Sequence, residues 1–132
     1  MKPRILLTED NTDAAEIIAF VLKFFGYDVV VAKDGVEAVE SAMSLRPDLI
    51  IMDMMMPRMD GFEAVSELRR HSETKTIPIL AVTAMAGPEG RKKCLAVGCD
   101  EYLPKPISPK TLGPAIQRLL RLPATSELTR EC

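Results

Sequence analysis

The stretch LIIMDMMMPRMDG, Leu49 to Gly61, decides how this chain is folded. Its four apolar residues, Leu49 to Met52, are typical of a strand that is buried on both faces, and such strands belong to parallel sheets covered by helices. The strand ends on the bare carboxylate of Asp53, and a methionine-rich loop with Asp60-Gly61 follows. A carboxylate at the end of so apolar a strand either caps a turn or faces a polar ligand.

Apolar runs alternate with segments of helical period along the whole chain. The expected strands are Arg4–Thr8, Asp28–Ala32, Asp48–Asp53, Ile77–Thr83 and a short one within Glu101–Pro106. The expected helices run from Asn11 or Thr12 to a stop at Gly26, from a cap at Asp34, over Gly61–His71, over Gly87–Val97, and from Ser108-Pro109 to near Arg121. Five strands that alternate with five helices predict an α/β fold with a five-stranded parallel sheet flanked by five helices.

The pattern inside the helices gives finer expectations. In the first helix, helical spacing predicts a core-facing set made of Ala14, Ile17, Ile18, Val21, Leu22 and Phe25. Gly113-Pro114 lies where the last helix should be running, and proline there loses a backbone bond, so we expect a late start near Gly113 or a kink. Gly90 is unfavourable inside the fourth helix. We interpret Arg69-Arg70 and Arg91-Lys92-Lys93 as solvated helix faces.

Length and composition limit the class of protein. A chain of 132 residues, 47% hydrophobic and 27% charged, is typical of one globular domain. A net charge of −2 gives no basic footprint for nucleic acid, and no apolar run reaches the roughly 18 residues of a membrane span. The early acid Glu9 argues against a secretory signal, and three cysteines without a CxxC pair fit a reduced, cytoplasmic setting. We expect a domain over residues 1–122 and a flexible tail or linker stub over 123–132.

Polar side chains follow the strands at one edge of the predicted sheet. Parallel α/β sheets place their ligands beyond the carboxyl ends of the strands, where Glu9-Asp10, Asp53, Thr83 and Lys105 occur. Three adjacent carboxylates require a compensating cation, and an all-oxygen set suits Mg²⁺. A carboxylate beside Mg²⁺ can attack phosphorus and form an aspartyl phosphate, while an ammonium and a hydroxyl bind the phosphoryl oxygens. The sequence therefore predicts Asp53 as a nucleophile.

These residues make the chain resemble the receiver domains of two-component response regulators. The matching positions are Glu9-Asp10, Asp53 with MPRMDG behind it, VTA with Thr83, and YLPKP with Lys105-Pro106, within Arg4–Arg121. The resemblance implies a flavodoxin-like receiver fold with sheet order 2-1-3-4-5.

The resemblance also implies a role for each acid. Asp53 would be the phosphoacceptor, and it would hold Mg²⁺ together with Glu9, Asp10 and the backbone carbonyl of Met55. Lys105 would pair with the phosphoryl group. A sensor histidine kinase or a histidine phosphotransfer protein would donate that group, so the chain would catalyse only its own phosphorylation and dephosphorylation.

The resemblance also implies which residues change conformation on phosphorylation. Thr83 and Tyr102 would form the switch pair, which changes the face made by the fourth helix, the fifth strand and the last helix. That face would bind a downstream protein partner, and the protein would be a monomer or a phosphorylation-dependent homodimer. The bond between Lys105 and Pro106 would be cis. Met55 and Met85 would flank the route of the attacking water, and two apolar side chains there would give a long-lived phosphoryl group.

Other classes of protein stay open. A receiver-shaped interaction module would share the fold without accepting phosphate. A haloacid-dehalogenase-like phosphatase would want a second aspartate where Met55 stands, and a flavodoxin-like FMN carrier would want a Ser/Thr/Gly-rich phosphate loop in place of TEDNTD. The residues after the last helix are too few for an output domain. If the natural chain ends there it is a stand-alone receiver, and if it is longer the residues from Pro123 begin a linker.

Overall fold

The computed structural model describes residues 2–56, 58–85 and 87–131, with the side chains of these residues described as far as Leu120. The strands are β1 (Arg4–Thr8), β2 (Asp28–Ala32), β3 (Leu49–Asp53), β4 (Ile79–Thr83) and β5 (Glu101–Pro104). The helices are α1 (Thr12–Phe24), α2 (Gly35–Leu45), α3 (Gly61–Arg70), α4 (Gly87–Val97) and α5 (Pro109–Glu131).

The strands form one parallel sheet in the order β2-β1-β3-β4-β5. The predicted fold class and strand order are confirmed. The direction of winding reverses between β1 and β3, and ligands of open α/β sheets bind at such a reversal. The carboxyl ends of these two strands are therefore where a site is expected.

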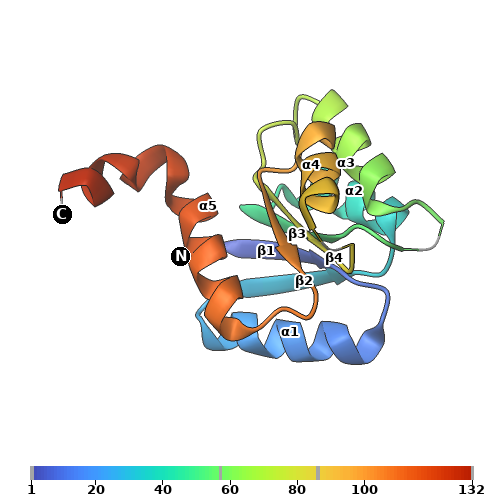
Figure 1. Ribbon diagram of the computed structural model, residues 1–132, viewed down its shortest axis with the longest axis horizontal. Coiled ribbons are helices and arrows are strands. Elements are labelled where there is room, and N and C mark those ends of the chain that lie inside the picture. Colours follow the sequence, from blue (N-terminus) through green and yellow to red (C-terminus); the bar gives the residue numbers. More distant parts are fainter. Residues whose placement is uncertain (1, 57, 86, 132) are drawn as a thin grey trace.

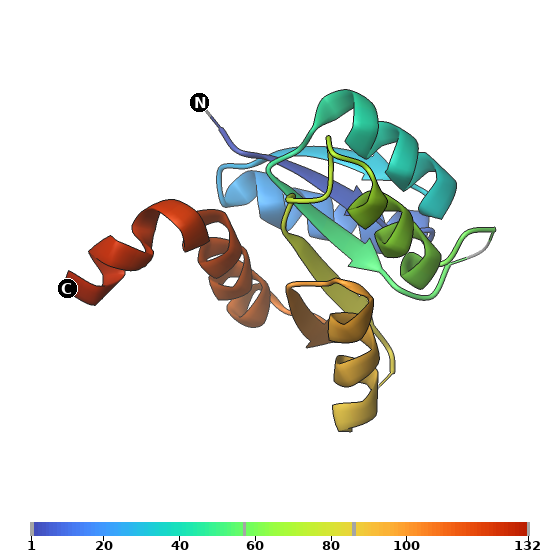
Figure 2. The ribbon, with the colours of Figure 1, turned by 90° about the horizontal axis from the view of Figure 1, so that it is seen from above.

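Helices cover both faces of the sheet (Figures 1 and 2): α1 and α5 lie on one side, and α2, α3 and α4 lie on the other. All residues of β3 and of β4 are buried, because both strands lie inside the sheet with a helical layer on each face. This explains why Leu49 to Met52 are apolar without alternation. It also means that Asp53 stands at the end of a rigid, fully packed strand.

Side-chain caps set the starts of three helices. Asn11, Asp34 and Asp60 each accept a hydrogen bond from the backbone N–H three residues further on, at 2.9, 2.9 and 3.0 Å. Such caps satisfy backbone donors that have no partner within the helix. The caps predicted at Asn11 and Asp34 are confirmed.

The face of α1 that meets the sheet differs from the predicted one. Its buried residues are Ala15, Ala19 and Leu22, whereas Ile17 is 66% exposed and Phe25 is 37% exposed. The prediction that Ile17 and Phe25 face the core is therefore wrong. Small alanines let the helix lie close against the sheet, and this close approach turns the larger apolar side chains outward.

The last helix also differs from expectation, because α5 begins at Pro109 and continues through Gly113-Pro114. The start expected at Ser108-Pro109 is confirmed, and the alternative of a late start near Gly113 is wrong. The residue before a proline avoids helical geometry because its Cβ meets the proline ring, and glycine at 113 has no Cβ. The helix continues to Glu131, past the expected end near Arg121, and its ribbon extends away from the sheet (Figure 1). Flexibility of residues 123–132 stays a prediction.

Candidate functional site

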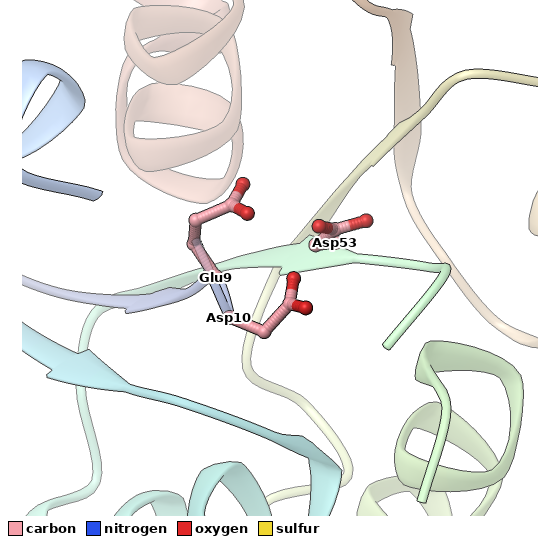
Figure 3. Close-up of side chains that lie close together, drawn as sticks. All are labelled: Glu9, Asp10 and Asp53. Carbon is pink, nitrogen blue, oxygen red and sulfur yellow. The ribbon is translucent and has the colours of Figure 1, made fainter. Parts of the chain in front are cut away.

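Three carboxylates meet at the carboxyl end of the sheet. Glu9 and Asp10 directly follow β1, and Asp53 is the last residue of the adjacent parallel strand β3. One carboxylate oxygen from each of the three lies within 4.8 Å of the others, and Figure 3 shows the side chains converging. Glu9 and Asp53 are buried, whereas Asp10 is exposed. The structure thus brings together the three acids that the sequence singled out.

Among the side chains that the structure describes, one ammonium group, that of Lys105, forms ion pairs with this cluster. The Nζ atom of Lys105 lies 3.0 Å from Oδ2 of Asp53 and 3.4 Å from Oε1 of Glu9. Burial of the Lys105 ammonium would lower its pKa, but the hydrogen bond to Asp53 and the two negative charges raise that pKa overall. Lys105 therefore stays charged, and three carboxylates against one cation leave the site negative.

The pKa of Glu9 is raised, chiefly because the carboxyl is buried. Burial raises this pKa most, and the nearby charge of Asp53 raises it further, against a hydrogen bond from the N–H of Asn11 and the ammonium of Lys105. A buried carboxylate that resists ionisation beside a like charge gains from a nearby cation. The donors are all oxygens, and the exposed side of Asp10 leaves space for water. This donor chemistry fits Mg²⁺, which prefers oxygen ligands and keeps several waters.

Thr83 and Tyr102 are both bonded to the backbone of Met85. The Oγ1 atom of the buried Thr83 accepts from the N–H of Met85 at 3.1 Å, and the hydroxyl of Tyr102 donates to the carbonyl of Met85 at 2.7 Å. A Cβ at Gly90 would lie 2.8 Å from that same carbonyl oxygen. Glycine inside α4 therefore has a reason that helix propensity did not reveal: it gives the Met85 carbonyl room to reach Tyr102.

Met55 follows the acid cluster in the loop after β3. Its backbone N–H donates to Oδ1 of Asp53 at 3.1 Å, and its side chain is 56% exposed. Both oxygens of the Asp53 carboxylate are therefore held, one by Met55 and one by Lys105. The peptide bond between Lys105 and Pro106 is cis, as the resemblance implied.

Two arginines have roles that the sequence did not indicate. Arg69 was expected on a solvated face, but its side chain is only 20% exposed. Its guanidinium donates to the carbonyls of Gly98, Lys75 and Ile77 at 2.9, 3.0 and 2.8 Å, and to the carboxylate of Asp100 at 2.9 Å. The interpretation of Arg69 as a solvated residue is wrong, because backbone acceptors leave no mark in a sequence.

The second arginine, Arg58, lies in the loop that follows Asp53. Its guanidinium donates to Oδ2 of Asp34, the cap of α2, through Nε at 2.9 Å and Nη2 at 2.6 Å. The sequence MPRMDG carries no signal for this pair, which joins residues 24 positions apart.

Comparison with known proteins agrees with the fold. A family model described as the response regulator receiver domain matches residues 5–117. The chain therefore belongs to the response regulator receiver domain family, and signalling in two-component systems is the setting of that family.

Two solved structures illustrate the likeness. The chemotaxis protein CheY4 of Vibrio cholerae is 37% identical with a TM-score of 0.84, and the match covers 90% of this chain and 99% of that one. The receiver domain of sensor histidine kinase PA1611 from Pseudomonas aeruginosa is 38% identical with a TM-score of 0.85, over 91% and 98% of the two chains. That second structure has a magnesium ion coordinated in its active-site cleft.

A curated relative is the DNA-binding dual master transcriptional regulator RpaA of Synechocystis, 36% identical over 119 residues. The match covers 90% of this chain and 49% of RpaA, and the chain spans about half the length of most curated relatives it matches. Because RpaA binds DNA, the expected absence of nucleic-acid binding is not confirmed. Over the part of the chain that the structure describes, none of the helices combines the length and apolarity needed to span a bilayer.

Proposed function

We propose that this receiver domain is a phosphorylation-dependent switch in which Asp53 accepts a phosphoryl group. The juxtaposition of Glu9, Asp10 and Asp53 within 4.8 Å, with Lys105 at 3.0 Å from Asp53, supports this proposal above all other observations. A carboxylate at the end of a rigid buried strand is fixed for in-line attack, and the neighbouring ammonium can neutralise charge on the transferred group.

Glu9, Asp10, Asp53 and the backbone carbonyl of Met55 would hold Mg²⁺, which when bound neutralises phosphoryl oxygens as a Lewis acid. The magnesium ion in the related PA1611 receiver supports this assignment. The chain's own part is to orient the acceptor. The Met55 N–H and the Lys105 ammonium each hold one oxygen of Asp53 and keep the carboxylate in a single orientation.

The phosphoryl donor would be a sensor histidine kinase or a histidine phosphotransfer protein. A bond forms between an oxygen of Asp53 and phosphorus, and the bond from phosphorus to the donor's imidazole nitrogen breaks. Lys105 then pairs with the phosphoryl oxygens. On this proposal the chain acts on no substrate other than its own aspartate.

The switch would act through Met85. A phosphoryl group on Asp53 offers the Thr83 hydroxyl a charged acceptor, and a turn of that hydroxyl would release the N–H of Met85. The carbonyl of the same residue holds Tyr102, so the change would be passed to the face formed by α4, β5 and α5. Phosphorylation would shift the population between two packings of this face, which binds a downstream protein.

Several expectations stay proposals alongside this one. The receiver domain would comprise residues 1–122, the setting would be cytoplasmic, and the protein would be a monomer or a phosphorylation-dependent homodimer. The phosphatase alternative lacks its second aspartate because position 55 is Met, and the FMN alternative would place phosphate against Glu9 and Asp10. The phosphate-free interaction module is the remaining competitor.

Intact mass after incubation with acetyl phosphate and Mg²⁺ tests the proposal. We expect a gain of one phosphoryl group that is lost in Asp53→Asn and kept in Asp28→Asn, a matched change at the exposed start of β2. No gain in the unmodified chain would leave the interaction module as the better description. The predicted long lifetime of the phosphoryl group is tested by its decay in Met55→Asn and Met85→Lys, and unchanged decay in both would reject it.

A further inference from the structure

The loop between β3 and α3, of which the structure describes residues 54–56 and 58–60, is bonded to the start of α2. The N–H of Gly35 donates to the carbonyl of Met59 at 3.0 Å, and a Cβ at position 35 would lie only 2.2 Å from that oxygen. Beside this contact the guanidinium of Arg58 donates twice to Oδ2 of Asp34. Two consecutive residues of the loop are therefore tied to two consecutive residues at the start of α2.

The backbone of Arg58 is held in an unusual conformation. Its φ is 62°, in the left-handed region that costs a non-glycine residue about 1–2 kcal/mol. The other non-glycine residue with positive φ in the described segments, Arg46, ends α2 and has the ordinary geometry of a helix C-cap. Such conformations persist where neighbouring contacts enforce them, and for Arg58 the contact is the charge-assisted pair with Asp34.

Asp34 is well suited to serve as the fixed partner. Its Oδ1 accepts from the N–H of Glu37 at 2.9 Å and caps α2, while its Oδ2 takes both donors of Arg58. The bond from the Glu37 N–H, followed by the contact with Arg58, holds the pKa of this carboxyl below its usual range. The pair therefore remains ionised at neutral pH, and the position of Asp34 is set by the helix.

The same loop touches the acid cluster. Its first residue, Met54, is fully buried, and its carbonyl accepts from the N–H of Gly61 at 3.1 Å. Between this anchor and Met59 lies Met55, whose N–H orients Asp53. Within residues 54–56 and 58–60, Asp60 caps the following helix α3, and Arg58 supplies the ion pair that joins the loop to α2.

Building on the proposed function, we propose that Arg58 is a positioning residue. Its ion pair with Asp34 holds the β3–α3 loop in the conformation that orients Asp53 and presents Met55 to Mg²⁺. A loop ordered before binding lowers the entropy lost when the metal binds. Arg58 thus raises the affinity of the site for a cation although it carries a positive charge itself.

The positive charge of Arg58 allows positioning to be distinguished from simple electrostatics, because the two predict opposite changes in Mg²⁺ affinity when Arg58 is removed. Removal of the Arg58 cation makes the acidic end of the molecule more negative, and long-range attraction alone would then tighten the binding of Mg²⁺. Loss of positioning weakens it instead. Removal of the Asp34 charge weakens the binding of Mg²⁺ both by loss of positioning and by loss of negative charge. The double variant separates these two causes, because it breaks the pair but restores the net charge.

Calorimetric titration with MgCl₂ provides the test. The variants are Arg58→Gly, where glycine accepts the positive φ without strain, Asp34→Asn, which keeps a capping oxygen for α2, and the double variant. We expect each single variant to raise the dissociation constant for Mg²⁺ about threefold to tenfold, at or below the usual effect of groups that orient metal ligands. The double variant should match the single ones, because the two changes break one pair.

Arg70→Ala is the matched control, since Arg70 is an exposed arginine paired with a carboxylate, that of Glu67, away from the loop. Its dissociation constant should equal that of the unmodified chain. Amide hydrogen exchange without metal gives a second readout, in which the Met55 N–H should exchange faster in Arg58→Gly and in Asp34→Asn. Because Asp34→Asn introduces no glycine, faster exchange there cannot come from a more flexible residue in the loop.

Unchanged or tighter binding of Mg²⁺ in Arg58→Gly would overturn the proposal, as would a double variant that returns to the affinity of the unmodified chain. Failure of the proposed function has a different signature. In that case the unmodified chain itself neither binds Mg²⁺ nor gains a phosphoryl group. If the unmodified chain does both and the variants bind equally well, only the role of Arg58 is refuted.

Discussion

The two ends of the sheet hold charged side chains in opposite ways. At the carboxyl end, three carboxylates share the single ammonium of Lys105 and remain in excess. At the amino end, the guanidinium of Arg69 is bonded through all three of its nitrogens, to Asp100 and to backbone carbonyls. Charges that are paired within the protein join segments of the chain, whereas the excess carboxylates favour the binding of a cation. Stability and function are thereby assigned to different ends of the same strands.

The largest expected effect is at the amino end. Replacement by Arg69→Met removes the cation beside Asp100, whose Oδ2 then keeps only the N–H of Ile79 as a donor. It also removes the shared donor of three backbone carbonyls, so we expect a loss of about 3 kcal/mol in the free energy of unfolding. Urea unfolding measures this loss. Arg70→Met, one residue along, removes only an exposed helix pair and should cost about 0.5 kcal/mol or less. Similar losses in both variants would contradict the contrast between the ends.

A smaller effect is expected beside the site, where α4 packs against Met85. In Gly90→Ala the new Cβ would stand 2.8 Å from the Met85 carbonyl, so either the loop or the helix must shift. We expect a loss of about 1.5 kcal/mol in spite of the better helix propensity of alanine. The ring signals of Tyr102 in an NMR spectrum should move, because its hydroxyl loses the acceptor. A gain in stability with unmoved Tyr102 signals would show that the contact is unimportant.

At the acid cluster we expect a change that stabilises the protein. Without metal, Glu9→Gln removes one of the repelling buried charges and should raise the free energy of unfolding by about 1 kcal/mol, after allowance for screening by water. Added Mg²⁺ should reverse the order of the two proteins, because only the intact acid set gains from binding. Glu16→Gln, an exposed change on α1, should do neither. A destabilised Glu9→Gln in metal-free buffer would mean that the cluster carries no excess charge.

The smallest effects are in the pH dependence, and they have opposite directions for Glu9 and Asp34. The folded protein raises the pKa of Glu9 above 4.5, so it binds that proton more tightly than the unfolded chain does. As the pH falls from neutral through this raised pKa, the stability gained by Glu9→Gln should therefore shrink.

Asp34 has its pKa lowered below 3.8, so its contribution is fully present above that value and is lost as the pH falls through the lowered pKa. We therefore expect Asp34→Asn to be less stable than the unmodified chain down to about pH 3.8, and this loss in the free energy of unfolding should disappear at lower pH. Unfolding curves for both variants and the unmodified chain, taken from neutral to acid pH, check both directions. Parallel curves at all pH values would exclude both shifts.

Much of this organisation was predictable from the sequence, for a physical reason. Strands covered on both faces have no polar positions, so a polar residue such as Asp53 or Thr83 marks the end of the strand. In a parallel sheet all such ends lie on one edge, and a list of strand ends becomes a list of site residues. The placement of Glu9, Asp10 and Lys105 followed from this rule alone.

The errors have equally definite causes. Helix α1 carries apolar residues around much of its circumference. Periodicity therefore could not show that the face with the small side chains of Ala15 and Ala19, rather than the face with Ile17, packs against the sheet. For α5 the start at Ser108-Pro109 was predicted, but the alternative of a late start near Gly113 was wrong, because Gly113 lacks the Cβ that would clash with the ring of Pro114. The ties made by Arg58 were invisible because they rest on tertiary geometry, which no local pattern encodes.

The bonds of Arg69 have a consequence for how the molecule can vary in evolution. Three of the groups it binds are peptide oxygens, at Lys75, Ile77 and Gly98, which every amino acid supplies. Mutations that exchange the side chains at positions 75 and 77 leave the acceptors in place as long as the path of the chain is kept. An exposed position such as Lys75 can therefore vary in sequence, whereas Thr74 and Ile77 are buried and stay constrained by packing. The charge requirement at this corner falls on Arg69 and Asp100.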